Sequence, residues 1–215
     1  MIERGKFIVV EGMGGSGKTT QMSFISELLT NNGIKNITTR EPGGIKSAEK
    51  IRKLIFSLRD KKLIGPEGQM VLFFAARDLW INGLVKPKLK KGISVTTDRC
   101  HTATGAYQGY AEGGDMNQII GISEVVMKDC KPDAVILLKL SAEISMKRKS
   151  DKEGDPFDKE DIKYFRRLAN GYNKMAKEGW GGLKWYVVNG EPAIYKVSGN
   201  LIPVLEDIFQ KKLQK

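Results

Sequence analysis

The amino-acid sequence predicts an α/β fold in which helices cover both faces of a five-stranded parallel sheet. Two observations carry this prediction: short apolar runs of strand length recur along the chain, and amphipathic stretches of helical length separate them. A helix between two strands favours a parallel sheet, because parallel neighbours need a crossover connection. The expected strands cover residues 6–11, 36–39, 93–97, 134–140 and 184–188.

The clearest helical pattern lies in the last third of the chain. Apolar residues at three- and four-residue spacing indicate the core-facing side of a helix that begins near Asp158: Ile162, Phe165, Ala169, Tyr172 and Ala176. The preceding segment, residues 147–158, is charged, nearly lacks apolar residues and contains Gly154 and Pro156. We therefore expect an exposed basic loop between two helices, which is a candidate lid.

Length and composition favour one domain over residues 1–215, since a chain of this size with 40% apolar content can enclose one continuous core. The longest apolar runs are far shorter than the roughly 20 residues that span a bilayer. The N-terminal residues show no export signal. Two cysteines, Cys100 and Cys130, are too few for a disulfide framework. These features predict a cytoplasmic protein with free thiols and no membrane contact.

The net charge of +11 is compatible with nucleic acid, a membrane surface or small phosphorylated ligands. Lysines are spread along the chain, and the densest cluster, KPKLKK at 86–91, lies between a helical segment and a strand. We interpret this cluster as a solvated helix end. Charge alone does not select the partner, so the motifs must decide.

A phosphate-binding loop follows the first expected strand. Gly12, Gly17, Lys18 and Thr19 satisfy the pattern G-x-x-x-x-G-K-[ST], between the strand FIVVE and an amphipathic helix. Glycines let backbone N–H groups surround phosphates, Lys18 supplies a cation for the β- and γ-phosphates, and the Thr19 hydroxyl is a candidate magnesium ligand. We therefore expect a P-loop NTPase fold that binds ATP through Gly12, Met13, Gly14, Gly15, Ser16, Gly17, Lys18, Thr19 and Thr20.

A phosphate loop alone does not distinguish a GTPase, a motor, a partitioning ATPase and a kinase. The chain has no N-K-x-D segment, which argues against a GTPase, and it is too short for the extra domains of a motor. Three further segments follow expected strands or lie on a helix, where the sheet would direct them to the cleft beyond the strand carboxyl ends. They are REPGG at 40–44, LFFAAR at 72–77 and DRCHTATGAYQG at 98–109.

In this order, EGMGGSGKTT, REPGG, LFFAAR and DRCHTATGAYQG resemble the motifs of bacterial-type thymidylate kinases across nearly the full chain. The resemblance implies that Arg40 helps to hold the acceptor phosphate, with Glu41 beside it in the acceptor site. It implies that Phe73 stacks on the thymine ring and Arg77 hydrogen-bonds the base, which suits an aromatic face and a planar guanidinium. Without the resemblance, ordinary core packing explains Phe73 equally well.

The same resemblance implies that Asp98 orients magnesium and that Arg99 lies between the two reacting phosphates. Arg148 matches a lid arginine that contacts the donor nucleotide. A positive charge around the transferring group stabilises the transition state of phosphoryl transfer. Lys18, Arg99 and Arg148 are therefore the expected catalytic residues.

Two further assignments follow from the resemblance. Thr104, Tyr107 and Gln108 would contact the base and sugar of the acceptor. The segment VVNGEP at 187–192 is either the loop beside the adenine or a plain Asn–Gly turn, and both readings stay open at this point.

The sequence departs from the thymidylate kinase pattern at three positions. Gly14 stands where many members carry an acidic residue that reads the acceptor sugar, and Cys100 follows Asp98–Arg99 where histidine or tyrosine is usual. Pro156 stands near the position of a late lid arginine. These departures bear on sugar discrimination and catalytic efficiency more than on the fold.

The expected reaction is ATP plus dTMP giving ADP plus dTDP, with magnesium. The alternatives are a related kinase with another nucleoside monophosphate as acceptor, and a non-catalytic nucleotide-binding module whose charge serves nucleic acid. Nucleic acid is not an expected partner of the kinase. A homodimer is expected from the family and from apolar residues that could instead fill one monomer's core: Leu79, Trp80, Ile119, Ile120 and Val125.

Overall fold

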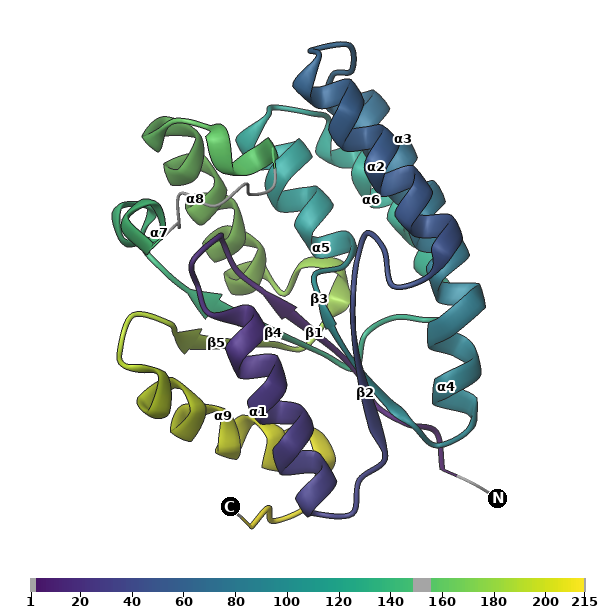
Figure 1. Ribbon diagram of the computed structural model, residues 1–215, viewed down its shortest axis with the longest axis vertical. Helices are drawn as coiled ribbons and strands as arrows, with labels where there is room; N and C mark the ends of the chain where they lie inside the picture. The colour runs from purple at the N-terminus through teal and green to yellow at the C-terminus, as the bar shows by residue number, and fades with distance from the viewer. Residues whose placement is uncertain (1–2, 149–155, 215) are drawn as a thin grey trace.

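Five strands form one parallel sheet in the computed structural model, which describes residues 3–148 and 156–214. The strand order is β2-β3-β1-β4-β5, with β1 at the centre (Figure 1). The strands are β1 Phe7–Glu11, β2 Asn36–Arg40, β3 Ser94–Asp98, β4 Ala134–Lys139 and β5 Trp185–Asn189. Each lies within one or two residues of its expected range, which confirms the predicted parallel sheet.

Helices fill most of the chain between the strands. The α-helices are α1 Lys18–Asn31, α2 Lys46–Asp60, α3 Pro66–Trp80, α4 Lys86–Lys90, α5 His101–Thr104, α6 Met116–Met127, α7 Ala142–Arg148, α8 Ile162–Glu178 and α9 Ile194–Phe209. Two π-helical segments continue α3 and α5, namely η1 Ile81–Val85 and η2 Gly105–Ala111. Two 3₁₀ turns, η3 Pro156–Lys159 and η4 Trp180–Gly182, flank α8.

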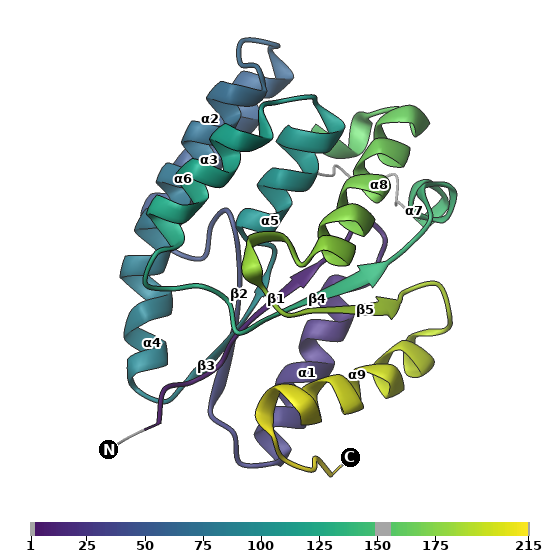
Figure 2. The ribbon, with the colours of Figure 1, turned by 180° about the vertical axis from the view of Figure 1, so that it is seen from behind.

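The two faces of the sheet bury alternate residues of the same strands. Ile8 and Val10 of β1 pack with the apolar sides of α1 and α9, which cover the face seen in Figure 1. Phe7 and Val9 point to the opposite face, where they pack with residues of α2, α3, η1 and α4. Helices α6 and α8 lie in front of the sheet on that side in Figure 2. This alternation follows from the two-residue period of a strand.

The predicted late helix, α8, begins at Ile162 rather than near Asp158. Asp161 caps it, because its side chain accepts a hydrogen bond from the backbone N–H of Tyr164. Phe165 and Tyr172 are buried as expected, whereas the predicted stripe missed Tyr164 and other buried residues of the same helix, namely Leu168, Gly171 and Met175. The basic cluster at 86–91 lies on α4 and at its end, as predicted.

Part of the expected apolar dimer surface belongs to the core of the monomer. Trp80 and Ile119 are fully buried in the chain, so for these two residues the alternative that they fill one monomer's core is confirmed. Leu79, Ile120 and Val125 remain exposed, Val125 to 76%. Among the described residues, every helix is too short or too polar to cross a bilayer.

Candidate active site

The phosphate loop connects β1 to α1 and has a backbone that only glycine adopts easily. Gly12 has φ +147°, and a Cβ atom there would lie 2.6 Å from Ser16 Oγ and 2.8 Å from the Leu138 carbonyl oxygen. Gly17, with φ +86°, precedes the first turn of α1. Ser145 Oγ of α7 donates to the Gly14 carbonyl oxygen at 2.6 Å. The loop is therefore held by strand, helix and α7 in a conformation that side chains would disrupt.

Lys18 lies inside this loop and is 8% exposed. Its Nζ donates to the carbonyl oxygens of Gly12 at 3.0 Å and Met13 at 3.3 Å, and it lies 3.8 Å from Asp98 Oδ1. Met13 is buried below the loop. Backbone oxygens of the loop thus hold the ammonium group within the phosphate loop, where a bound phosphate would meet a cation.

Asp98 ends β3 beside the phosphate loop. Its Oδ1 is buried and lacks a hydrogen bond to the described residues, and its nearest cations, Lys18 Nζ and Arg99 Nε, are both 3.8 Å away. Thr19 and Thr20 at the start of α1 are exposed. A carboxylate oxygen with unused acceptor capacity and a nearby hydroxyl are the oxygen ligands that Mg²⁺ takes. Thr19 and Asp98 therefore fit a magnesium ion.

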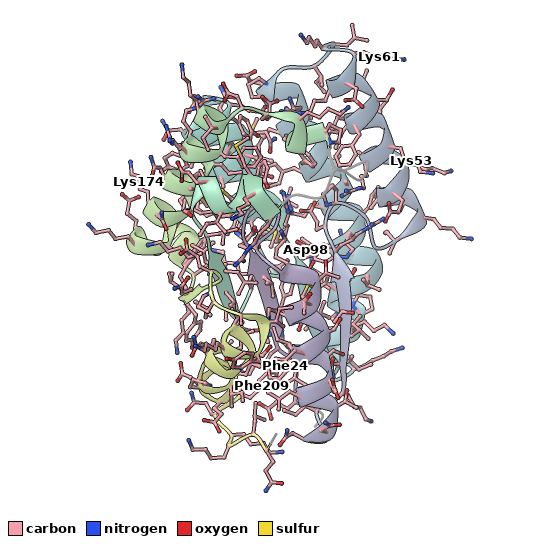
Figure 3. All side chains as sticks on the ribbon, turned by 60° about the vertical axis from the view of Figure 1, so that its left-hand side comes forward. Phe24, Lys53, Lys61, Asp98, Lys174 and Phe209 are labelled. Atoms are coloured by element: carbon pink, nitrogen blue, oxygen red, sulfur yellow. The ribbon has the colours of Figure 1, made fainter. Side chains whose placement is uncertain are left out.

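Asp98 also lines a pocket of about 700 Å³, its open mouth included. All eight residues predicted for the acceptor line this pocket: Arg40, Glu41, Phe73, Arg77, Arg99, Thr104, Tyr107 and Gln108. They come from β2, α3, β3 and the α5–η2 segment, which the sheet topology brings together at the strand carboxyl ends. Figure 3 shows Asp98 at the middle of the molecule, whereas Lys53, Lys61 and Lys174 reach outward.

The buried wall of the pocket presents an arginine with spare donors. Arg77 Nη2 donates to Glu41 Oε2 at 2.8 Å and to Thr104 Oγ1 at 3.0 Å. Its Nε and Nη1 are buried without hydrogen-bond partners among the described residues. Phe73 is buried and belongs both to the core and to the pocket lining, so its core packing is confirmed and its stacking on a base stays a prediction. Buried unpaired donors beside an apolar ring indicate a site for a flat ligand with acceptor atoms.

Arg40 and Arg99 both line the pocket, and the side chain of Arg40 is the more exposed of the two. Arg40 is exposed at the mouth and donates to Glu49 Oε1 at 2.9 Å. Arg99 has φ +71°, and its guanidinium lies 4.5 Å from the centre of the Tyr107 ring. A left-handed backbone at a non-glycine residue is uncommon and clusters at functional sites. With this backbone, Arg99 lies in the pocket lining with its guanidinium over the Tyr107 ring.

Glu11, the last residue of β1, holds the chain around Arg99. Its fully buried carboxylate accepts hydrogen bonds from the Cys100 backbone N–H at 3.2 Å, from Tyr172 Oη at 2.7 Å and from Thr102 Oγ1. Burial raises the pKa of Glu11, and the hydrogen bonds from Thr102 and Tyr172 offset part of that rise. From the sequence, Glu11 is only the end of the first expected strand. The sequence feature that could have indicated its role is a charged residue within the apolar run FIVVE, a pattern that predicts a buried carboxylate with hydrogen-bond partners.

Phe157 is a second site residue that the sequence analysis missed. It was placed in an exposed loop, yet it is buried in the pocket, 5.2 Å from Tyr107 and 6.3 Å from Phe73 between ring centres. The sequence feature that could have indicated its burial is that Phe157 is the one aromatic residue in a charged segment. Residues 149–155 of the predicted lid lie outside the described residues. Arg52 and Phe56 of α2 also line the pocket.

Arg148 ends α7 next to the phosphate loop, since a Cβ atom on Gly15 would lie 2.9 Å from its Cβ. Its guanidinium donates to the carbonyl oxygens of Gly190 at 2.8 Å and of Glu191. The 187–192 loop is also close to the phosphate loop, because a Cβ atom on Gly190 would lie 3.5 Å from the Ser16 carbonyl oxygen. Arg148 therefore joins the end of α7, beside the phosphate loop, to the 187–192 loop.

His101, the only histidine of the chain, lies behind Arg99 and stacks on Trp180 with ring centres 5.4 Å apart. Burial, with a smaller contribution from Arg77, lowers the pKa of His101 to about 3 from its usual 6.5. Between about pH 3 and pH 6.5 the unfolded chain binds more protons than the folded chain. The free energy of unfolding therefore falls as the pH decreases through this range.

The lowered pKa of His101 predicts how the free energy of unfolding changes in acid. Between pH 6 and 4 the wild-type protein is expected to lose about 1.4 kcal/mol per pH unit more than His101→Phe, which keeps the stacked ring. Urea unfolding of both proteins over this range measures the difference. Parallel losses in the two proteins would show that His101 is not neutral in the folded state.

Comparison with known proteins places this site in a family. A family model for thymidylate kinase matches residues 10–198. A thymidylate kinase from Francisella tularensis subsp. novicida is 30% identical over 208 residues, covering 96% of this chain and 98% of the relative. A thymidylate kinase from Carboxydothermus hydrogenoformans is 36% identical over 176 residues, covering 81% and 86%.

A solved structure agrees with the sequence comparisons. The crystal structure of thymidylate kinase from Ehrlichia chaffeensis superposes with a TM-score of 0.76 at 27% identity, over 94% of this chain and 99% of that one. The shared P-loop NTPase fold, the near-complete coverage and the matching family model confirm the resemblance seen in the motifs. This chain belongs to the thymidylate kinase family.

Proposed function

We propose that this protein transfers the γ-phosphoryl group of ATP to the phosphate of dTMP, giving ADP and dTDP. One observation carries the proposal: Asp98 lies beside Lys18 of a loop shaped for the phosphates of a nucleotide, and with Arg99 it lines a pocket that combines aromatic rings with an arginine that has buried, unpaired donors. Family membership supports the same reaction.

The acceptor nucleotide would lie with its base in the buried part of the pocket. Phe73 offers a face for stacking, and the unpaired donors of Arg77 suit a carbonyl oxygen of thymine. Arg40 and Arg99, which both line the pocket, would hold the acceptor phosphate. Both nucleotides would thus be aligned before reaction, and alignment is a large part of the catalysis of phosphoryl transfer.

In the reaction, an oxygen of the acceptor phosphate forms a bond to the γ-phosphorus while the bond from that phosphorus to the bridging oxygen breaks. The acceptor is already anionic, so no protein base is required. Lys18 and Arg99 would stabilise the charge on the transferring group, and Arg148 would order the donor side through the 187–192 loop. A bound Mg²⁺ would neutralise charge on the β- and γ-phosphates.

Magnesium dependence follows from the donor set of Thr19 and Asp98. Chelation with EDTA is expected to abolish turnover, and Asp98→Asn is expected to raise the Mg²⁺ concentration for half-maximal activity by about ten- to a hundredfold. The measurement is initial rate against free Mg²⁺ for both proteins. An unchanged Mg²⁺ requirement in Asp98→Asn would remove Asp98 from the metal site.

The proposed reaction is tested by ADP release with MgATP and a panel of acceptors: dTMP, dUMP, UMP, CMP, dGMP and AMP. A clear preference for dTMP is expected. Preference for another monophosphate would keep the kinase and change its acceptor, and Gly14, which lacks an acidic side chain for the sugar, makes UMP the informative comparison with dUMP. ATP binding without any turnover would favour a non-catalytic module.

We also propose a cytoplasmic homodimer. Helices α3 and α6 pack against each other and leave apolar residues exposed on the outer surface, among them Val71, Leu79 and Val125. A second copy of the chain would cover them, in keeping with the low exposure of contiguous apolar surface on monomers. Light scattering of Val125→Lys against wild type tests this, since a charge in the interface should shift the protein towards a monomer.

A further inference from the structure

An arginine behind the acceptor pocket joins four elements of the fold. Arg59, near the end of α2, donates to Glu112 Oε1 and Glu160 Oε1, both at 2.6 Å. Its guanidinium lies 3.8 Å from the centre of the Phe157 ring, and its side chain is 12% exposed. No motif of the sequence analysis includes Arg59.

Arg59 also determines how the amide of Gln69 is oriented. Its Nη1 donates to Gln69 Oε1 at 3.1 Å. Because arginine can only donate, the oxygen of the Gln69 amide must face it, and the Gln69 NH₂ group turns to the Ile64 carbonyl oxygen at 3.4 Å. The same Gln69 oxygen accepts a hydrogen bond from Gln108 Nε2 at 3.2 Å. The orientation of the Gln108 amide therefore depends on Arg59, which can only donate and which acts on Gln108 through Gln69.

This hydrogen bond is one of two that connect α3 to the α5–η2 segment around the stacking ring. Gln69, Phe73 and Arg77 follow one another at four-residue spacing on α3, so they share one side of that helix. Arg77 bonds Thr104, and Gln69 bonds Gln108 four residues further on. Phe73 thus lies between the two bonds. The Gln108 oxygen accepts no hydrogen bond from the described residues, and Gln108 lines the pocket.

We propose that Gln69, oriented by Arg59, is a positioning residue of the acceptor site. It holds the Gln108 NH₂ group away from the ligand and leaves the Gln108 oxygen to accept a hydrogen bond from an N–H or O–H of the acceptor nucleoside. Thymidine carries two such donors, the N3–H of the base and the 3′-hydroxyl. The inference rests on the proposed function and adds to it the residues that set the polarity of this contact.

Three variants test the inference by steady-state kinetics. Gln69→Leu removes the oxygen that holds Gln108, and it is expected to raise KM for dTMP by about three- to tenfold, the usual effect of one lost neutral hydrogen bond. KM for ATP and kcat should change less than twofold, because the contact is made equally before and during transfer. Gln69→Glu keeps an oxygen for both Arg59 and Gln108 and should restore KM for dTMP.

The matched control is Gln21→Leu, since Gln21 and Gln69 are both 2% exposed and Gln21 lies on α1 among contacts to α9. It should lower the melting temperature without changing KM for dTMP. Two analogues then identify the ligand donor: the effect of Gln69→Leu should vanish for N3-methyl-dTMP if the base donates, or for 3′-deoxy-dTMP if the sugar donates.

The outcomes separate this inference from the proposed function. Turnover of dTMP by the wild type with an unchanged KM in Gln69→Leu would overturn the positioning role and leave the kinase assignment in place. Failure of Gln69→Glu to restore KM would do the same, because it would point to packing rather than to an oriented oxygen. Absence of dTMP turnover by the wild type would instead overturn the proposed reaction.

Discussion

Replacing Lys18 with alanine is expected to lower kcat at least about a hundredfold, the effect that loss of one charge-stabilising donor commonly has in an active site. The reason is geometric. Lys18 Nζ is held by the carbonyl oxygens of Gly12 and Met13 within the phosphate loop, where it would meet the β- and γ-phosphates. ADP release with saturating MgATP and dTMP measures the loss.

Lys53→Ala provides the control for this substitution, because Lys53 is exposed on α2 and reaches away from the site (Figure 3). It should retain wild-type kcat. Circular dichroism and thermal melting should show that Lys18→Ala is folded, since the hydrogen bonds that it loses to the Gly12 and Met13 carbonyl oxygens lie within the phosphate loop. Near-normal turnover by purified Lys18→Ala would contradict the assignment of the phosphate loop.

Replacing Arg77 with methionine is expected to affect stability and acceptor binding together. The side chains of Arg77 and Glu41 are each 1% exposed, so removal of the guanidinium leaves a carboxylate buried without its charge partner. Breaking a buried pair from one side costs about 3–5 kcal/mol. For a chain of this size that corresponds to a melting temperature lower by about 6–20 °C. Differential scanning calorimetry and a dTMP titration measure the two effects.

The double variant Arg77→Met, Glu41→Gln separates these effects. It removes the Glu41 charge that Arg77→Met leaves buried without a partner. The melting temperature should therefore return most of the way to that of the wild type. Binding of dTMP should stay weak, because the unpaired donors of Arg77, a residue of the pocket lining, are still missing. Recovery of dTMP affinity in the double variant would show that Arg77 supports the fold and does not contact the base.

The parts of this protein that were predictable from sequence are those with a local physical cause. Alternating strand and helix patterns predicted all five strands, and the signal was clearest in β1 and β4, because strands buried on both faces of a parallel sheet favour continuous apolar runs. The phosphate loop was readable because its glycines are required by the backbone itself, as the positive φ angles of Gly12 and Gly17 show. The motif order also indicated the thymidylate kinase family, which the comparisons confirm.

Other features were decided only when distant segments came together. Phe157 looked exposed within a charged segment, but Phe73 and Tyr107 provide an apolar pocket for it, and the guanidinium of Arg59 covers its ring. Trp80 looked available for a dimer, but packing against Phe7 buries it in the monomer. A propensity or a charge run describes neighbours in sequence, whereas burial depends on the whole chain.

The sequence by itself therefore determined the order of the elements, the phosphate loop and the identity of the groups available for chemistry, since these depend on backbone conformation and residue type. Only the tertiary structure decided which donors and acceptors stay unpaired, such as those of Arg77 and Asp98, and which way Gln108 faces. Hydrogen bonding is a short-range, directional interaction between residues far apart in the chain, so its outcome follows from three-dimensional placement alone.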